Sequence, residues 1–194
     1  MQNIDALLQL LLMLITEPRT AVLFILLVIA SIFDYRIYKI PNCLTVGGMG
    51  FALIYSAVAP FNRDHGFLWA MGGLAIGFFT MLPCYAIRVM GAGDVKLMAM
   101  VGAFLGVTDT LFAMLYSLII GGVAAIGFAL VNKVMSRLIV NVKSAAQLMM
   151  LSAMGGFKPD MHIEPGTSVG KLPYGICIGS GTIIFIVAKQ LGFV

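Results

Sequence analysis

The stretch GAGDVKLMAM, residues 91–100, places two glycines, an acid and a base between apolar runs. We interpret it as the junction between two membrane-spanning helices, with Asp94 at the start of the second. An acid at a helix start can accept backbone N–H bonds and interacts favourably with the helix dipole. Asp94 is therefore either an N-cap or a functional carboxylate.

The composition around this stretch is that of a membrane protein. Of the 194 residues, 61% are hydrophobic and 10% are charged, and the mean hydropathy is +1.04. A spanning helix needs roughly 20 mostly apolar residues, so the chain has room for about six. We predict an all-α, polytopic integral membrane protein.

Six apolar stretches predict the spans: about 20–35, 43–60, 67–88, 95–107, 110–132 and 173–192. The only charge before the first apolar run is Asp5, whereas a signal peptide has positive charge there, and Pro18 interrupts the segment. We therefore expect residues 1–19 to form an interfacial helix or an outer extension of the first span. We expect residues 20–194 to form the membrane domain, with a cytoplasmic loop at about 133–172.

The basic residues predict the orientation, because cytoplasmic loops are enriched in Lys and Arg. One side of the predicted bundle receives nine of them: Arg36, Lys39, Arg88, Lys96, Lys133, Arg137, Lys143, Lys158 and Lys171. The other side receives three: Arg19, Arg63 and Lys189. The richer side is assigned to the cytoplasm, which places the N-terminus outside.

Other site classes have little support in the sequence. Cys43, Cys84 and Cys177 are isolated and do not cluster with His65 or His162, so we expect no disulfide framework and no metal site. The positive charge is scattered, without a basic patch or an aromatic platform for bases, and we expect no nucleic-acid partner.

Two acids are predicted to lie at the inner ends of spans. Asp34 ends LFILLVIASIFD and Asp94 opens DVKLMAMVGAF, so the topology brings both to the cytoplasmic membrane interface. Each also has a purely structural interpretation. Asp34 could be a helix-end acid paired with Arg36 or Lys39, and Asp94 could be only a helix cap.

Taken together, the two acids suggest hydrolysis. Two carboxylates that share a site can hold one proton between them, activate a water molecule and protonate a leaving amine, as in aspartic peptide hydrolysis. Gly91 and Gly93 could give the backbone unusual conformations or let a bound strand approach, or could simply form a flexible turn. Lys96 is interpreted mainly as an interfacial residue and secondarily as a charge that favours ionised Asp94.

Three motifs resemble those of the type IV prepilin peptidases, which are GxGD membrane aspartyl proteases. GAGDVKL at Gly91–Leu97 is similar to their G-x-G-D-x-K-L motif, and DYRIYKIPN at Asp34–Asn42 is similar to the segment with their first aspartate. KLPYG at Lys171–Gly175 resembles the P-[FY]-G element that opens their last helix. The three motifs occur in the family's order and cover most of the chain.

This resemblance implies a function and a set of site residues. Asp34 and Asp94 would be the catalytic pair, without a cofactor or metal. The partners would be the lipid bilayer and type IV prepilin or pseudopilin precursors, cut on the cytoplasmic side of the bacterial inner membrane. The other motif residues would shape the site: Gly91, Gly93, Lys96, Ile40, Pro41, Asn42, Pro173, Tyr174 and Gly175.

The chain also departs from the long, bifunctional members of the family. It has no C-x-x-C pair, so we expect cleavage without N-methylation. The short chain resembles either the Flp-pilus (tight-adherence) branch of the family or the archaeal preflagellin peptidases. Gly175 is not followed by the proline that many relatives have, and residues 134–172 exceed a minimal connector.

Two functions from other classes remain open from the residues alone. Asp34, Asp94 and Lys96 could form an ion relay in a small transporter or channel. The chain could also be a non-catalytic scaffold for pilus assembly that retains a peptidase fold.

Overall fold

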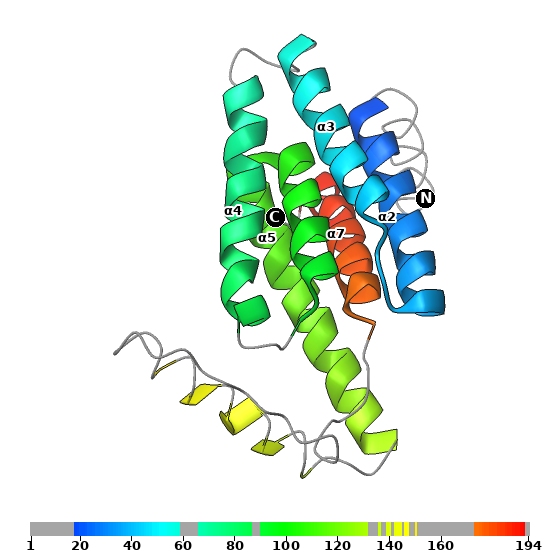
Figure 1. Ribbon diagram of the computed structural model, residues 1–194, viewed down its shortest axis with the longest axis vertical. Helices are drawn as coiled ribbons and strands as arrows, with labels where there is room; N and C mark the ends of the chain where they lie inside the picture. Colours follow the sequence, from blue (N-terminus) through cyan, green and yellow to red (C-terminus); the bar gives the residue numbers. More distant parts are fainter. Residues whose placement is uncertain are drawn as a thin grey trace.

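The protein is an all-helical bundle in the part of the chain that the structure describes. The computed structural model describes residues 18–58, 66–86, 90–131 and 173–192, with short pieces between 136 and 150. Five helices run through these ranges (Figure 1): α2 (Pro18–Ile37), α3 (Asn42–Val58), α4 (Phe67–Ala86), α5 (Ala92–Val131) and α7 (Tyr174–Gln190). The expected fold class is confirmed.

The helices agree with the predicted spans. Within the described residues, α2, α4 and α5 are long and apolar enough to cross a membrane, whereas α3 and α7 are apolar helices of 17 residues. The chain is therefore a polytopic membrane protein. Residues 1–17 and nearly all of the expected 133–172 loop lie outside the described part of the chain.

Helix α5 contains two of the predicted spans. Its backbone leaves the helical region at Gly106, with φ 79° and ψ −177°, which divides it into residues 92–105 and 107–131. The chain changes direction there in Figure 1: the first half rises through the bundle, and the second half descends past its lower end. The predicted spans 95–107 and 110–132 correspond to these halves.

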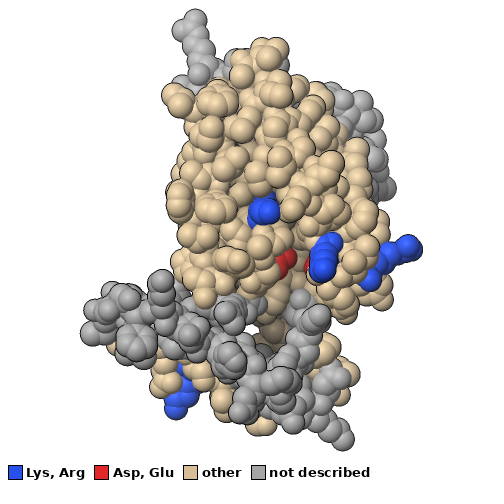
Figure 2. Space-filling view, in the orientation of Figure 1, with Lys and Arg blue, Asp and Glu red and all other residues tan. Residues whose placement is uncertain are grey.

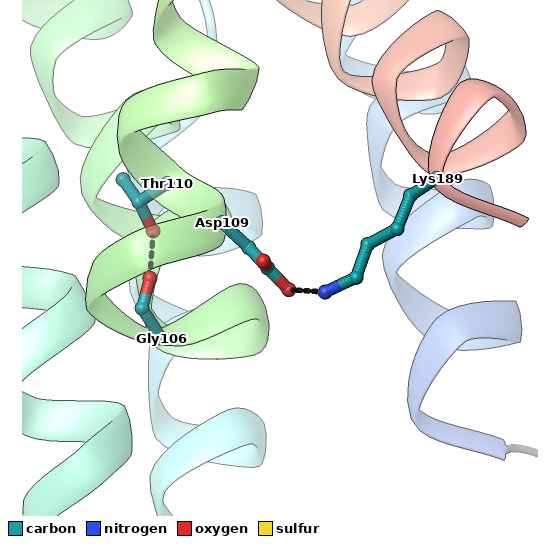
Figure 3. Close-up of polar contacts among 4 residues, drawn as sticks. All are labelled: Gly106, Asp109, Thr110 and Lys189. Carbon is teal, nitrogen blue, oxygen red and sulfur yellow. Dashed lines mark hydrogen bonds and ion pairs between the residues drawn. The ribbon is translucent and has the colours of Figure 1, made fainter. Parts of the chain in front are cut away.

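Glycine is required at this break for two reasons. A positive φ is costly for residues with a Cβ, and a Cβ on Gly106 would overlap the indole of Trp69. The second half of α5 is fixed just beyond the break (Figure 3), where the Thr110 hydroxyl donates to the Gly106 carbonyl and Asp109 forms an ion pair with Lys189 of α7.

The first half of α5 is the central element of the bundle. Nine successive residues from Val95 to Ala103 include only one that is not buried, Lys96. A helix that is apolar on every face is typical of a position surrounded by other helices. Asp94, at the start of this half, is thus carried by the most enclosed element of the fold.

Close glycine contacts join α4 to this central element. A Cβ on Gly73 would overlap the carbonyl oxygen of Gly102, and a Cβ on Gly102 would overlap that of Gly73. One turn further along α4, a Cβ on Gly77 would likewise overlap the carbonyl oxygen of Met98. Small residues four apart let membrane helices approach until their backbones touch, so van der Waals packing holds α4 against α5.

Candidate active site

Asp34 is held by the N-terminus of α7. It lies near the C-terminal end of α2, is only 6% exposed, and its Oδ2 accepts a 2.6 Å hydrogen bond from the backbone N–H of Gly175. The N-cap residue of α7, Pro173, provides no side-chain cap. Asp34 therefore supplies from α2 the acceptor that a helix N-terminus needs, at the end where the helix dipole favours a carboxylate.

Gly175 permits this contact. A Cβ there would lie 2.7 Å from Oδ2 and 2.9 Å from Cγ of Asp34. Within the described residues Asp34 forms no ion pair, so the alternative pairing with Arg36 or Lys39 is not observed.

The chain leaves α2 through a strained residue just beyond Asp34. Tyr38 has φ 53°, and its N–H donates to the Asp34 carbonyl oxygen at 3.0 Å. This is a left-handed helix C-cap, a position that glycine usually occupies. The turn leads into Pro41, whose carbonyl oxygen accepts the N–H of Leu44 in the first turn of α3.

Asp94 closes the first turn of α5 and is not its N-cap. The helix begins at Ala92, which places Gly91 at the cap position and Asp94 in the first turn. Oδ2 of Asp94 accepts the N–H of Gly91 at 3.0 Å, and the Asp94 N–H donates to the Gly91 carbonyl oxygen at 3.1 Å. An acid at the third helical position that reaches back to the cap residue forms half of a capping box. Asp94 is 8% exposed.

The structure brings the two aspartates together. Both are nearly buried, one at the end of α2 and the other at the start of α5, and they lie near enough for the charge of one to affect the other. Two side chains of α7 lie near the pair: Tyr174 is near Asp94, and Cys177 is near both aspartates. Sequence reasoning treated Cys177 only as an isolated cysteine, although its place one helical turn after Pro173 could have indicated that it faces the site.

Contacts between the two aspartate-bearing motifs fix the surroundings of the pair. The side chain of Ile40 lies 3.5 Å from where a Cβ on Gly93 would be. The Lys96 ammonium donates to Oδ1 of Asn42 at 2.9 Å. Lys96 is thus held by the first residue of α3, not by the carboxylate of Asp94, and links the IPN and GAGD segments.

The two motif glycines have ordinary backbone conformations. Neither Gly91 nor Gly93 has a positive φ, so the expectation of an unusual backbone there is wrong. A Cβ at either position would make only an ordinary contact, the nearest at 3.4 Å from Asp94 Oδ2. Close approach of a bound strand and a flexible turn both remain predictions for these two positions.

Few charged side chains lie on the described part of the face shown in Figure 2, and most of them are basic. Figure 2 shows a small red area in the lower half of the bundle beside blue side chains, on a face that is otherwise tan. Among the described residues no three His, Cys, Asp or Glu side chains gather as a metal site. The chemistry that the pair can perform is proton transfer: together the carboxylates can hold and polarise a water molecule and protonate a leaving amine.

The profile of the type IV leader peptidase family matches residues 21–126 of the chain. The chain belongs to this family. The matched region includes both Asp34 and Asp94 with their motifs, and it ends before the third motif at Pro173–Gly175. The resemblance to the type IV prepilin peptidases is therefore confirmed at the level of the family.

A curated relative supports the same assignment. The prepilin leader peptidase/N-methyltransferase of Bacillus subtilis (strain 168) is 30% identical over 122 residues. The alignment covers 60% of this chain and 47% of the relative, so the chain spans about half the length of the protein it matches. No solved structure gives a significant match.

Proposed function

We propose that this protein is a membrane aspartic endopeptidase that removes the leader peptide of type IV prepilins or pseudopilins. The observation that carries the proposal is the pair of nearly buried carboxylates, Asp34 and Asp94, contributed by two different helices and interacting electrostatically. A purely structural acid needs no acidic neighbour in a membrane, where a second charge adds cost. Family membership gives the pair its reaction class.

The proposed mechanism uses the pair as general acid and general base. The scissile carbonyl of the precursor lies between the carboxylates, with a water molecule bound by both. The ionised carboxylate takes a proton from the water as it attacks the carbonyl carbon, and the protonated carboxyl group of the other aspartate gives its proton to the leaving amine. Because the two carboxyl groups interact, each step of their titration belongs to the pair and not to one residue. The hydrogen bonds from Gly175 and Gly91 orient the carboxylates for this task.

The substrate is proposed to be Flp-like and to be cut on the cytoplasmic side. The name of the Bacillus relative supports a prepilin substrate, and the excess of Lys and Arg in alternate loops supports an external N-terminus and a cytoplasmic dyad. The precursor's apolar helix lies against the bundle while its leader reaches the interface.

Cleavage is proposed to occur without N-methylation. The support is the lack of any C-x-x-C pair in the sequence, where the three cysteines stand at positions 43, 84 and 177. Mass spectrometry of the mature product would give the free N-terminal mass, and a product heavier by one methyl group would contradict this part of the proposal.

Single Asp34→Asn and Asp94→Asn variants test the dyad. Each should insert normally and leave a co-expressed prepilin at precursor size. The matched control is Asp109→Asn, which removes a carboxylate at the opposite end of the bundle, where Asp109 pairs with Lys189. Full processing by either dyad variant would falsify the proposal and favour a scaffold, whereas ion flux abolished by the same variants would indicate a relay.

A chelator distinguishes catalysis by the two aspartates from catalysis by a bound metal ion. Processing in detergent should persist in excess chelator, because the two carboxylates provide both the acid and the base. Loss of processing that is restored by an added divalent ion would contradict the mechanism.

A further inference from the structure

Arg19 lies at the end of the bundle opposite the dyad and contacts two other helices there. Its Nη2 donates to the carbonyl oxygen of Ala103 in α5 at 3.0 Å. Its guanidinium carbon lies 4.4 Å from the ring centroid of Trp69 in α4, within the range of a cation–π interaction. Arg19 is partly buried.

The break in α5 makes the Ala103 carbonyl available. The first half of α5 ends just before Gly106, and the last carbonyl groups of a helix have no intrahelical partners. The C-terminal end of a helix also favours a positive charge. Arg19 meets both requirements, while Trp69 fills the space that a side chain on Gly106 would occupy.

This contact joins the two helices that carry the aspartates. Arg19 and Asp34 are both in α2, about 22 Å apart along the helix axis, and Ala103 and Asp94 are both in the first half of α5, about 14 Å apart. The helices are rigid over such lengths, so a shift at the Arg19 end becomes a shift at the dyad.

The hydrogen bonds that the two carboxylates accept do not themselves join α2 to α5. Asp34 is bound by α7, through Gly175, and Asp94 is bound within its own turn, by Gly91. Neither of these bonds runs from α2 to α5. The bond from Arg19 to Ala103 does, and the glycine contacts of α4 keep the first half of α5 from tilting away.

We infer that Arg19 is a positioning residue, which sets the register between α2 and the first half of α5 and thereby the separation of Asp34 and Asp94. The inference rests on the proposed peptidase function for its kinetic consequences. Its geometric consequence is independent of that function.

The kinetic test compares Arg19→Ala and Arg19→Lys with a matched control, Lys189→Ala. The control removes an ion pair at the same end of the bundle, but this pair joins α7 to the second half of α5 (Figure 3). For Arg19→Ala we expect kcat for prepilin cleavage to fall about tenfold with KM unchanged, since small misplacements of catalytic groups are costly. The pH profile of kcat should also change, because the coupling between two carboxylates depends on their separation.

Arg19→Lys should restore part of kcat, because an ammonium can still bind the carbonyl but cannot stack flat on Trp69. It also keeps the test valid if the alanine variant does not accumulate. Lys189→Ala should lower thermal stability without changing kcat or the pH profile. The inference is overturned if the Arg19 variants change only the melting temperature, or if Lys189→Ala alters kcat equally.

A cross-linking test needs no activity. Asp34→Cys and Asp94→Cys are combined in a chain whose native cysteines are replaced by alanine, and thiol cross-linkers of two lengths are compared. Adding Arg19→Ala should change the preferred length, and adding Lys189→Ala should not. An unchanged preference overturns the inference even if the wild type cleaves prepilin, and a changed preference sustains it even if no prepilin is cleaved.

Discussion

Oδ2 of Asp34 and the backbone nitrogen of Gly175 are 2.6 Å apart, although 141 residues separate them in the sequence. The contact is possible because Gly175 has no side chain on the face that meets α2. It connects the first described helix to the last one at the site.

Gly175→Ala should therefore impair the site more than the fold. The new Cβ would displace the Asp34 carboxylate, and we expect processing to fall about a hundredfold, measured as the rate of prepilin cleavage in detergent. The control is Gly122→Ala, where a Cβ would meet no atom within 4 Å. Equal rates for the two variants would show that the contact does not orient Asp34.

The link between Lys96 and Asn42 should matter more for activity than for stability. Because the pair is exposed, Asn42→Ala should change the free energy of unfolding by less than about 1 kcal/mol. It should reduce kcat about tenfold by loosening the two aspartate-bearing motifs. Asn42→Asp keeps an acceptor for the ammonium and should retain most activity. If Asn42→Asp is as impaired as Asn42→Ala, the link is not the cause.

Gly93→Ala separates a substrate role from a structural one. The backbone there is ordinary, and the nearest atom to the new Cβ would be 3.5 Å away, in Ile40. The melting temperature should stay the same or rise, because alanine favours helix over glycine by about 1 kcal/mol. We expect KM to rise about tenfold if the precursor's backbone passes this face. An unchanged KM would place the precursor elsewhere.

Substitutions at the crossing of α4 and α5 should act on stability. Gly102→Ala puts a Cβ into the carbonyl oxygen of Gly73, and overpacking of this kind costs about 1–3 kcal/mol. Denaturant unfolding in mixed micelles measures the loss. Gly47→Ala, with open space around the new Cβ, is the control and should be neutral. A stable Gly102→Ala variant would mean that the helices can separate at little cost.

Much of this fold could be predicted from hydropathy and charge. The apolar runs predicted the helices within a few residues, and the gap between the predicted spans 95–107 and 110–132 lies next to the break at Gly106. The depth shared by Asp34 and Asp94 followed from counting loop charges. Apolar runs are recognised from neighbouring residues, and loop charge is a simple count, so a single sequence is enough for both predictions.

The partners of individual side chains could not be predicted in the same way. In a membrane, residues that face lipid and residues that face another helix are equally apolar, so hydropathy does not show which face packs where. The glycines at 73, 77, 102 and 106 did carry a usable signal in their four-residue spacing. Nothing in the sequence indicated that Arg19 would bind the Ala103 carbonyl or that Asp34 would cap α7.

The capping of α7 by Asp34 also bears on the order in which the site is assembled. A chain that ended before Pro173 would contain both aspartates and all of the region matched by the family, yet it would lack the N–H group that binds Asp34. The carboxylate is oriented only when the last described helix has entered the membrane and docked on α2. If the proposed function is correct, cleavage therefore requires that α7 has docked on α2, because Gly175 donates the hydrogen bond that orients Asp34.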